Sequence, residues 1–170
     1  FTFIPNPINT DSIPFYPNSI NDKIVIFHGV NKYSSIKKGS SFFDEALIRI
    51  KEKYSTKVKV ITATSLPYKD YQKAYSAAHI VLDQVYSFDQ GYNALEAMAK
   101  GKVVFTGAET AFTEHYNLSE KVAINALPDV DYLVNELSHL IENPQEIVAI
   151  GNRARVFIER EHHYVNIANK

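Results

Sequence analysis

Short runs of apolar residues, most of them rich in Val and Ile, recur along the chain and alternate with segments that have the period of an α-helix. The runs are KIVIFH, KVKVITA, HIVLDQ, KVVFT and KVAIN. Runs that are apolar on both faces are typical of strands buried in a sheet, and strands separated by helices favour parallel pairing. The alternation therefore predicts an α/β domain with a mostly parallel sheet that helices cover on both faces.

The helical segments carry start signals and buried stripes. Ser41 is a candidate N-cap for the segment 41–54, and an Asn143-Pro144 pair followed by Glu146 indicates a new helix with a cap, a first-turn Pro and a capping-box acid. The expected helices are 41–54, 68–77, one that begins near Gly91, one that begins at Pro128 or Asp129, and one that begins at Asn143.

The first 20 residues differ from the rest of the chain because Pro5, Pro7, Pro14 and Pro17 fall within them. Proline disfavours both regular helix and central strand. We therefore interpret residues 1–20 as an interdomain linker or hinge and residues 21–170 as one domain. A chain that opens on a linker, with Phe1 and not Met, is expected to follow another domain.

The composition limits the classes of function. The 170 residues are 45% hydrophobic, and 18 Lys and Arg against 19 Asp and Glu give a net charge of -1, so no overall field favours nucleic acid. Cysteine is absent, which excludes disulfides and thiolate chemistry, and the histidines lack ligand spacing with carboxylates, so we expect no metal. No spanning segment or signal peptide is readable, which favours the cytoplasm.

The turn SFDQGYN follows the third apolar run and places Gly91 where a helix should begin. In open α/β sheets, ligands bind beyond the carboxyl ends of the strands. Unpaired N–H groups at a helix start attract anions, so the segment from Gly91 through Tyr92 to Asn93 is a candidate pyrophosphate site. The alternative is an ordinary turn between a strand and a helix.

Glu96 lies on the same expected helix, flanked by Leu95 and Ala97. A buried carboxylate in such surroundings is costly unless it meets a partner. It could accept hydrogen bonds from ribose hydroxyls, or it could be solvated or paired with a nearby Lys.

The turn after the first run reads HGVNKYSSIKKGSS and is basic and punctuated by glycine. Lys38, next to Gly39, is the best placed residue to neutralise a diphosphate, with Lys32 as a possible helper. His28 and Gly29 end the strand at the crevice, where they could contact a substrate, although solvated lysines and a structural histidine are the alternatives. Neither a Walker A motif nor a G-x-G-x-x-G fingerprint is present, which disfavours P-loop and NAD chemistry.

Taken together, these segments resemble the C-terminal, donor-binding domain of GT-B glycosyltransferases of the retaining group 1 family (the GT4-like group). The segment FIPNPINTDSIPF resembles the hinge of that family, HGVNKYSSIKKG its phosphate loop, and GYNALEAMAKGKVVFTG its hallmark helix and next strand. The resemblance covers essentially the whole chain. It implies a Rossmann-like, three-layer α/β/α domain that forms the C-terminal half of a GT-B enzyme.

The resemblance also implies roles for individual residues. Glu96 matches the Glu that binds the donor ribose. Phe88 stands where the family has a second Glu that contacts the donor hexose, so the neighbouring Asp89 is the candidate substitute. Val30 replaces the Arg of the phosphate loop, which leaves Lys38 and Lys32 as diphosphate contacts.

The implied reaction transfers a glycosyl group from a UDP- or GDP-linked sugar to a saccharide or glycolipid acceptor, as in polysaccharide or lipopolysaccharide synthesis in bacteria. Lys38 and the helix start would stabilise the leaving diphosphate, and no metal or other cofactor would be required. Acceptor binding would belong to an N-terminal domain of the same chain, so residues 1–170 alone should bind a nucleotide without turnover. The expected location is the cytoplasm, at the inner face of the membrane where the acceptor is lipid-linked.

Three other functions fit parts of the sequence. A receiver-like signalling domain would use Asp83 as its phosphoacceptor, but the first strand ends in FHG, without the acids that such a domain needs. A catalytically degenerate donor-like domain could serve as an interaction module, as Phe88 and Val30 suggest. A GT-B epimerase acting on UDP-sugars would share the donor site.

Overall fold

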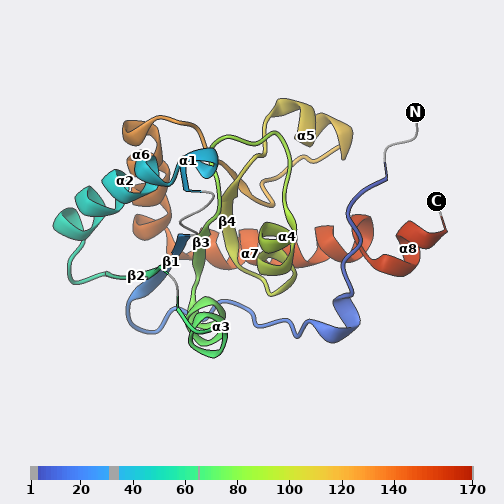
Figure 1. The fold of residues 1–170 in the computed structure, drawn as a ribbon, viewed down its shortest axis with the longest axis horizontal. Helices are drawn as coiled ribbons and strands as arrows, with labels where there is room; N and C mark the ends of the chain where they lie inside the picture. The colour runs from blue at the N-terminus through green and yellow to red at the C-terminus, as the bar shows by residue number, and fades with distance from the viewer. Residues whose placement is uncertain (1–3, 31–34, 65, 170) are drawn as a thin grey trace.

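The computed structural model describes residues 4–30, 35–64 and 66–169, which form a single five-stranded sheet flanked by helices (Figure 1). Every neighbouring pair of strands is parallel, in the order β2-β1-β3-β4-β5. In the middle of the sheet, Ile26 pairs with Val60 on one side and with Ile80 on the other. The strands are β1 (Ile24–Val30), β2 (Val58–Thr64), β3 (Ile80–Leu82), β4 (Val103–Thr106) and β5 (Ile124–Asn125).

The helices follow the strands in the alternation that the sequence predicts. They are η1 (Thr10–Ser12), α1 (Ser35–Lys38), α2 (Ser40–Lys53), α3 (Tyr68–Ala77), α4 (Tyr92–Ala99), α5 (Thr110–His115), α6 (Val130–Glu142), α7 (Pro144–Glu161) and α8 (Tyr164–Ala168). The prediction of a mostly parallel α/β domain is therefore confirmed. The short helix α5 was not expected from the sequence.

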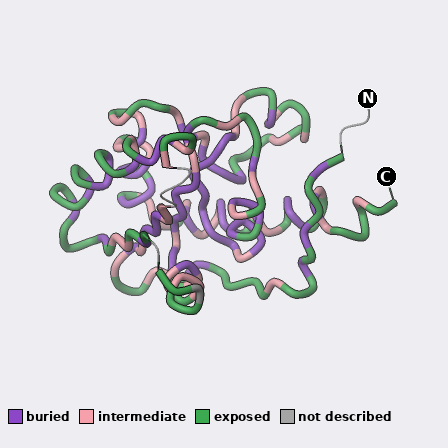
Figure 2. The backbone as a smooth tube through the Cα atoms, viewed as in Figure 1, coloured by how far each residue is buried: buried purple, intermediate pink, exposed green. Residues whose placement is uncertain are grey.

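The two faces of the sheet pack into two hydrophobic clusters, because successive side chains of a strand point to opposite sides. Ile80 and Leu82 contribute to the cluster that contains α2 and α6, whereas Val81 between them contributes to the cluster that contains α4 and the second half of α7. In Figure 2 the strands at the centre are buried while the outer turns of the helices are exposed. The sheet is thus the middle layer of three.

The residues that precede α2, α6 and α7 make different contacts. The helix expected to begin at Pro128 or Asp129 is α6, and Asp129 caps it, since its carboxylate accepts a hydrogen bond from the Tyr132 backbone N–H at 3.0 Å. The prediction of Ser41 as the cap of α2 is wrong: Gly39 precedes that helix in a left-handed conformation with φ of 65°, where a side chain would collide with Val85. Asn143 precedes α7 but makes no side-chain cap hydrogen bond to it, and its side-chain NH2 group donates to the His139 carbonyl of α6.

The proline-rich segment at the start of the chain lies against the other end of the sequence. Ile8 forms an isolated parallel bridge with His163, and the Arg155 guanidinium of α7 donates to the carbonyl oxygens of Ile13 and Ala99, each at 2.8 Å. Figure 1 shows this segment running beside α7 and α8. Residues 5–13 are therefore tied to the domain through hydrogen bonds to α7 and to the residues that follow it.

Candidate functional site

The sheet has its switch point between β1 and β3, because the chain leaves these neighbouring strands towards opposite faces. The connection after β1 leads to α2 on one face, and the connection after β3 leads to α4 on the other. Such a divergence opens a crevice at the carboxyl ends of the two strands, which is where ligands bind in open α/β sheets. His28 and Gly29 lie near the carboxyl end of β1, which ends at Val30, and Asp83 directly follows β3.

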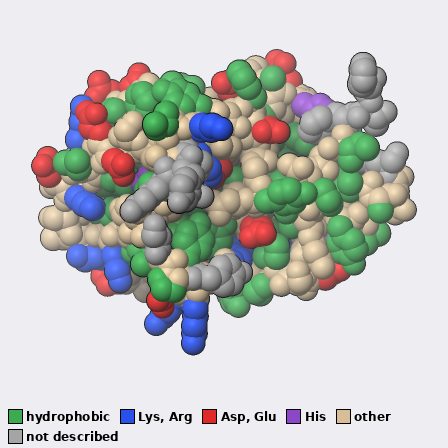
Figure 3. Space-filling view, in the orientation of Figure 1, with side chains coloured by type: hydrophobic (Ala, Val, Ile, Leu, Met, Phe, Trp, Pro, Cys, Tyr) green, Lys and Arg blue, Asp and Glu red, His purple; other side chains and the backbone are tan. Residues whose placement is uncertain are grey.

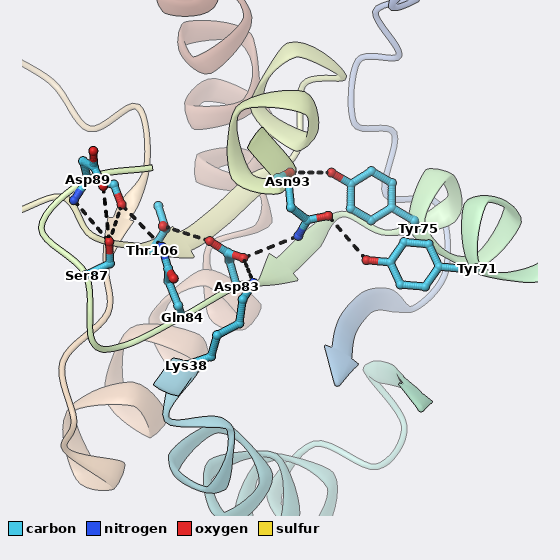
Figure 4. Close-up of polar contacts among 9 residues, drawn as sticks. All are labelled: Lys38, Tyr71, Tyr75, Asp83, Gln84, Ser87, Asp89, Asn93 and Thr106. Atoms are coloured by element: carbon cyan, nitrogen blue, oxygen red, sulfur yellow. Dashed lines mark hydrogen bonds and ion pairs between the residues drawn. The ribbon is translucent and has the colours of Figure 1, made fainter. Parts of the chain in front are cut away.

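Lys38 and Asp83 meet at this switch point. The Lys38 Nζ atom lies 2.7 Å from Asp83 Oδ1, and the side chain of Asp83 is 1% exposed whereas that of Lys38 is 30% exposed (Figure 4). Thr106 donates to the other carboxylate oxygen at 3.2 Å, and the Asn93 amide approaches Oδ1 at 3.4 Å. The lysine that the sequence assigns to a diphosphate therefore has a buried counter-ion.

The start of α4 lies beside this ion pair. Gly91 precedes the helix in an extended conformation, no side chain caps the first turn, and a Cβ at Gly91 would meet nothing within 4 Å. Asn93 faces Asp83, while Tyr92 is more than half exposed. The helix start that was predicted at Gly91 is confirmed, and its first backbone N–H groups have no side-chain cap.

Two tyrosines of α3 make hydrogen bonds to the first turn of α4. The Tyr75 hydroxyl donates to the Asn93 carbonyl at 2.7 Å, and the Tyr71 hydroxyl approaches the Asn93 side-chain oxygen at 3.4 Å. Burial raises the pKa of Tyr75 well above its ordinary value, with a further contribution from Tyr71, so Tyr75 remains a donor at neutral pH. These contacts fix the position of α4 relative to α3.

Glu96 does not have the buried surroundings that its apolar neighbours in the sequence indicate, because its own side chain faces outward from α4 and is exposed. It lines a pocket of about 460 Å³ together with Tyr92 and Lys100 of α4, residues of α3 and residues of the proline-rich segment. Among the described residues, no hydrogen bond or ion pair engages the Glu96 carboxylate. Lys100 instead approaches Gln72 at 3.4 Å and lies over the Tyr75 ring.

His28 is fully buried in β1, against Phe43, with its Nε2 atom 3.6 Å from an oxygen of Asp44. Burial lowers the pKa of His28 below its ordinary value of 6.5, although Asp44 opposes the shift, so the ring is neutral at pH 7. Gly29 lies beside the Tyr71 ring, where a Cβ would come within 3.0 Å of the hydroxyl. A donor-binding role for His28 and Gly29 stays a prediction.

Asp89 and Glu96 line different pockets. Phe88 and Asp89 line a cavity of about 270 Å³ with residues of α5, whereas the Glu96 pocket includes neither of them. Asp89 accepts a hydrogen bond from the Ser87 hydroxyl at its backbone oxygen, and Phe88 is 82% exposed. Lys32 lies outside the described residues, so its proposed contact with a diphosphate stays a prediction.

Asp83 is the residue of this site that the sequence reasoning missed as a partner of Lys38. The available signal was a charged residue at the carboxyl end of a buried apolar run, in HIVLDQ. Pairing it with Lys38 requires knowledge that β1 and β3 are neighbours, which strand order alone reveals.

Within the described ranges, no group of three or more His, Cys, Asp or Glu side chains is placed to hold a metal ion. No helix in the described part of the chain is long and apolar enough to cross a bilayer. On the face shown in Figure 3, Lys and Arg side chains are interspersed with acidic and uncharged ones.

The fold is that of the Rossmann-like C-terminal domain of GT-B glycosyltransferases. The sequence profile of the family described as glycosyl transferase-like matches residues 33–170, and the chain belongs to that family. No curated protein matches the chain significantly by sequence.

Solved structures of glycosyltransferases share the fold. Sucrose-phosphate synthase from Thermosynechococcus elongatus superimposes with a TM-score of 0.69 at 19% identity, over 97% of this chain and 49% of that one. HepE from Anabaena, in complex with UDP-glucose, gives a TM-score of 0.65 at 18% identity over 96% of this chain and 54% of that one. The C-terminal domain of LpcC, a group 1 family protein from Francisella tularensis, gives 0.63 at 18% identity, over 92% and 98%. The chain thus spans about half the length of the first two proteins and nearly all of an isolated C-terminal domain.

Proposed function

We propose that this chain is the donor-binding half of a glycosyltransferase and that it binds a nucleoside diphosphate sugar at the crevice between β1 and β3. The observation that carries the proposal is the exposed Glu96 carboxylate, which has no partner among the described residues and lies one turn beyond the uncapped start of α4. A carboxylate in this position can accept hydrogen bonds from both hydroxyl groups of a ribose, and the backbone N–H groups of the helix start can donate hydrogen bonds to a diphosphate.

In the proposed reaction, the bond between the anomeric carbon and the diphosphate breaks through an oxocarbenium-like state. Lys38 and the N–H groups of Gly91, Tyr92 and Asn93 would stabilise the negative charge that develops on the diphosphate. The acceptor would be a saccharide or glycolipid held by an N-terminal domain of the same chain. Its hydroxyl oxygen would form the new bond to the anomeric carbon, and its proton would pass to the departing diphosphate. We propose retention of configuration, as the resemblance to the retaining group 1 family implies. We also propose that no metal is required, because a lysine and a helix start supply the positive charge.

The test is a calorimetric titration of the chain with UDP and with GDP. We expect one of the two to bind and Glu96→Ala to weaken that binding about tenfold or more, as for the loss of hydrogen bonds to a charged group. Glu52→Ala is the matched control, because Glu52 is an exposed acid of α2 on another part of the surface. Equal affinities in wild type and Glu96→Ala would remove Glu96 from the site.

The metal requirement is tested in the same titration. We expect the affinity for the nucleotide to be the same in EDTA and in Mg²⁺, and a strong gain with Mg²⁺ would contradict the proposed role of Lys38 as the main cation.

A second candidate function is a donor-like domain that binds a nucleotide sugar without transferring the sugar. The observation that favours it is the ion pair with Asp83, which already offsets the charge of Lys38. The two candidates differ in turnover: a transferase in its complete form consumes the donor when an acceptor is supplied, whereas a binding module leaves the donor intact.

A further inference from the structure

A buried carboxylate beside the lysine assigned to a diphosphate is unexpected, because both the carboxylate and the ligand are negative. Asp83 is 3% exposed and lies 2.7 Å from the Lys38 ammonium. A second anion that approaches Lys38 therefore meets an ammonium charge that Asp83 already balances. The site is partly buried, so screening by water is weak there.

Residues of three different elements make hydrogen bonds to the Asp83 carboxylate. Thr106 of β4 donates to Oδ2 at 3.2 Å, while Lys38 of α1 and Asn93 of α4 approach Oδ1 (Figure 4). Asn93 is in turn contacted by Tyr71 and Tyr75 of α3. The carboxylate cannot move away from Lys38 without breaking these contacts, so a ligand must share the lysine with it.

Lys38 still has donors to share. An ammonium group carries three N–H bonds, and one described acceptor, Asp83, engages it. The Lys38 side chain is 30% exposed, so its free N–H bonds can reach a ligand in the crevice while the ion pair persists.

We propose that Asp83 determines how tightly this site holds a diphosphate, by offsetting the charge of Lys38 and thereby weakening its attraction for phosphate groups. The inference rests on the proposed function and adds a residue to it. A free nucleoside diphosphate carries about one more negative charge than its sugar-linked form, because the sugar ester removes one ionisable oxygen. Repulsion by Asp83 therefore acts more strongly on the product than on the donor, which favours release of the product.

The test measures binding of inorganic pyrophosphate and of UDP to the chain by calorimetry at low ionic strength. We expect Asp83→Asn, which keeps the size of the side chain and one of its two acceptor oxygens but removes the charge, to bind pyrophosphate at least tenfold more tightly than wild type. The gain should disappear in the double variant Asp83→Asn/Lys38→Gln, because it acts through Lys38. Thr106→Val is the matched control, since it removes a hydrogen bond from Asp83 without a change in charge.

Each result decides the question. Unchanged or weaker pyrophosphate binding in Asp83→Asn, with a circular dichroism spectrum like that of wild type, overturns the proposal, and so does a gain that persists without Lys38. Asp83→Ser provides a second neutral variant in case Asp83→Asn does not fold. The outcome is separate from that of the proposed function: if UDP binds no better than pyrophosphate and Glu96→Ala has no effect, the nucleotide site is wrong while the effect of Asp83 on pyrophosphate can still be read.

Discussion

The Tyr75 hydroxyl donates a hydrogen bond of 2.7 Å to the backbone carbonyl of Asn93, and this contact joins α3 to the first turn of α4. The strand β3 separates the two helices in the sequence. The position of the helix start beside Lys38 and Asp83 thus depends on a side chain from another helix.

Tyr75→Phe should destabilise the domain by about 1 kcal/mol, the net contribution of one hydrogen bond, because Phe keeps the ring and removes the donor. Urea unfolding measures the change. Tyr71→Phe is the matched control, because its contact with the Asn93 side chain is longer, at 3.4 Å, and should contribute less. An equal loss in both variants would argue against a specific role for the Tyr75 hydroxyl.

Two glycines of the same region should respond differently to alanine. At Gly107 a Cβ would lie 2.2 Å from the Ser87 carbonyl oxygen, so Gly107→Ala must displace the backbone of the turn that precedes α4. We expect a loss of about 3 kcal/mol, at the upper end of the usual cost of overpacking. At Gly91 a Cβ would meet nothing within 4 Å, and Gly91→Ala should cost about 1 kcal/mol or less, as for a change at an N-cap. Thermal unfolding of the two variants provides the comparison, and a larger loss at Gly91 would contradict it.

Gly91→Ala also tests the ligand. If a diphosphate lies against the start of α4, the added methyl group should weaken UDP binding while the fold is retained, which calorimetry can measure. Wild-type affinity in this variant would show that the ligand does not approach Gly91 closely.

Lys102 offers a test of stability at alkaline pH. Its side chain is buried before β4, and burial, with help from Lys100, lowers its pKa to about 8 from an ordinary value of 10.5. Between these two values the unfolded chain binds a proton that the folded chain does not, so the stability of wild type should rise with pH over this interval.

Lys102→Met removes that titration. The variant should be more stable than wild type near pH 7, by up to about 3 kcal/mol, and the difference should shrink as the pH rises from about 8 to 10.5. Urea unfolding at a series of pH values measures it, with Lys59→Met of β2 as the exposed control. A difference that does not depend on pH would contradict the prediction.

His28 should make the domain sensitive to acid. Because burial lowers its pKa below 6.5, the unfolded chain binds a proton more readily, and stability should fall as the pH drops below about 6.5. His28→Phe keeps a ring against Phe43 but cannot titrate, so its stability should fall less over the same range. Parallel curves for the two proteins would show that His28 does not contribute.

Much of the architecture could be predicted from local patterns, and the reason is physical. Strands buried on both faces must be apolar throughout, and helices that cover them must be apolar on one stripe. These local patterns therefore predict the strands in KIVIFH and HIVLDQ and the helices α2 and α4. The helix starts near Gly91 and near Asp129 could be predicted because their causes lie within a few residues. Ser41 was wrong as a cap because the close packing of Gly39 against Val85, a distant residue, decides where α2 begins.

The sequence by itself determined the alternation of strands and helices, the family and the candidate residues Lys38, Gly91 and Glu96. Only the tertiary structure decided which charges meet. The order β2-β1-β3 places Asp83 beside Lys38, 45 residues away in the chain. The packing of α4 leaves the Glu96 side chain exposed, in a pocket shared with the proline-rich segment. Sequence patterns report whether a residue is compatible with burial, but the partner of a charge depends on which strands become neighbours, and that is settled by packing of the whole sheet.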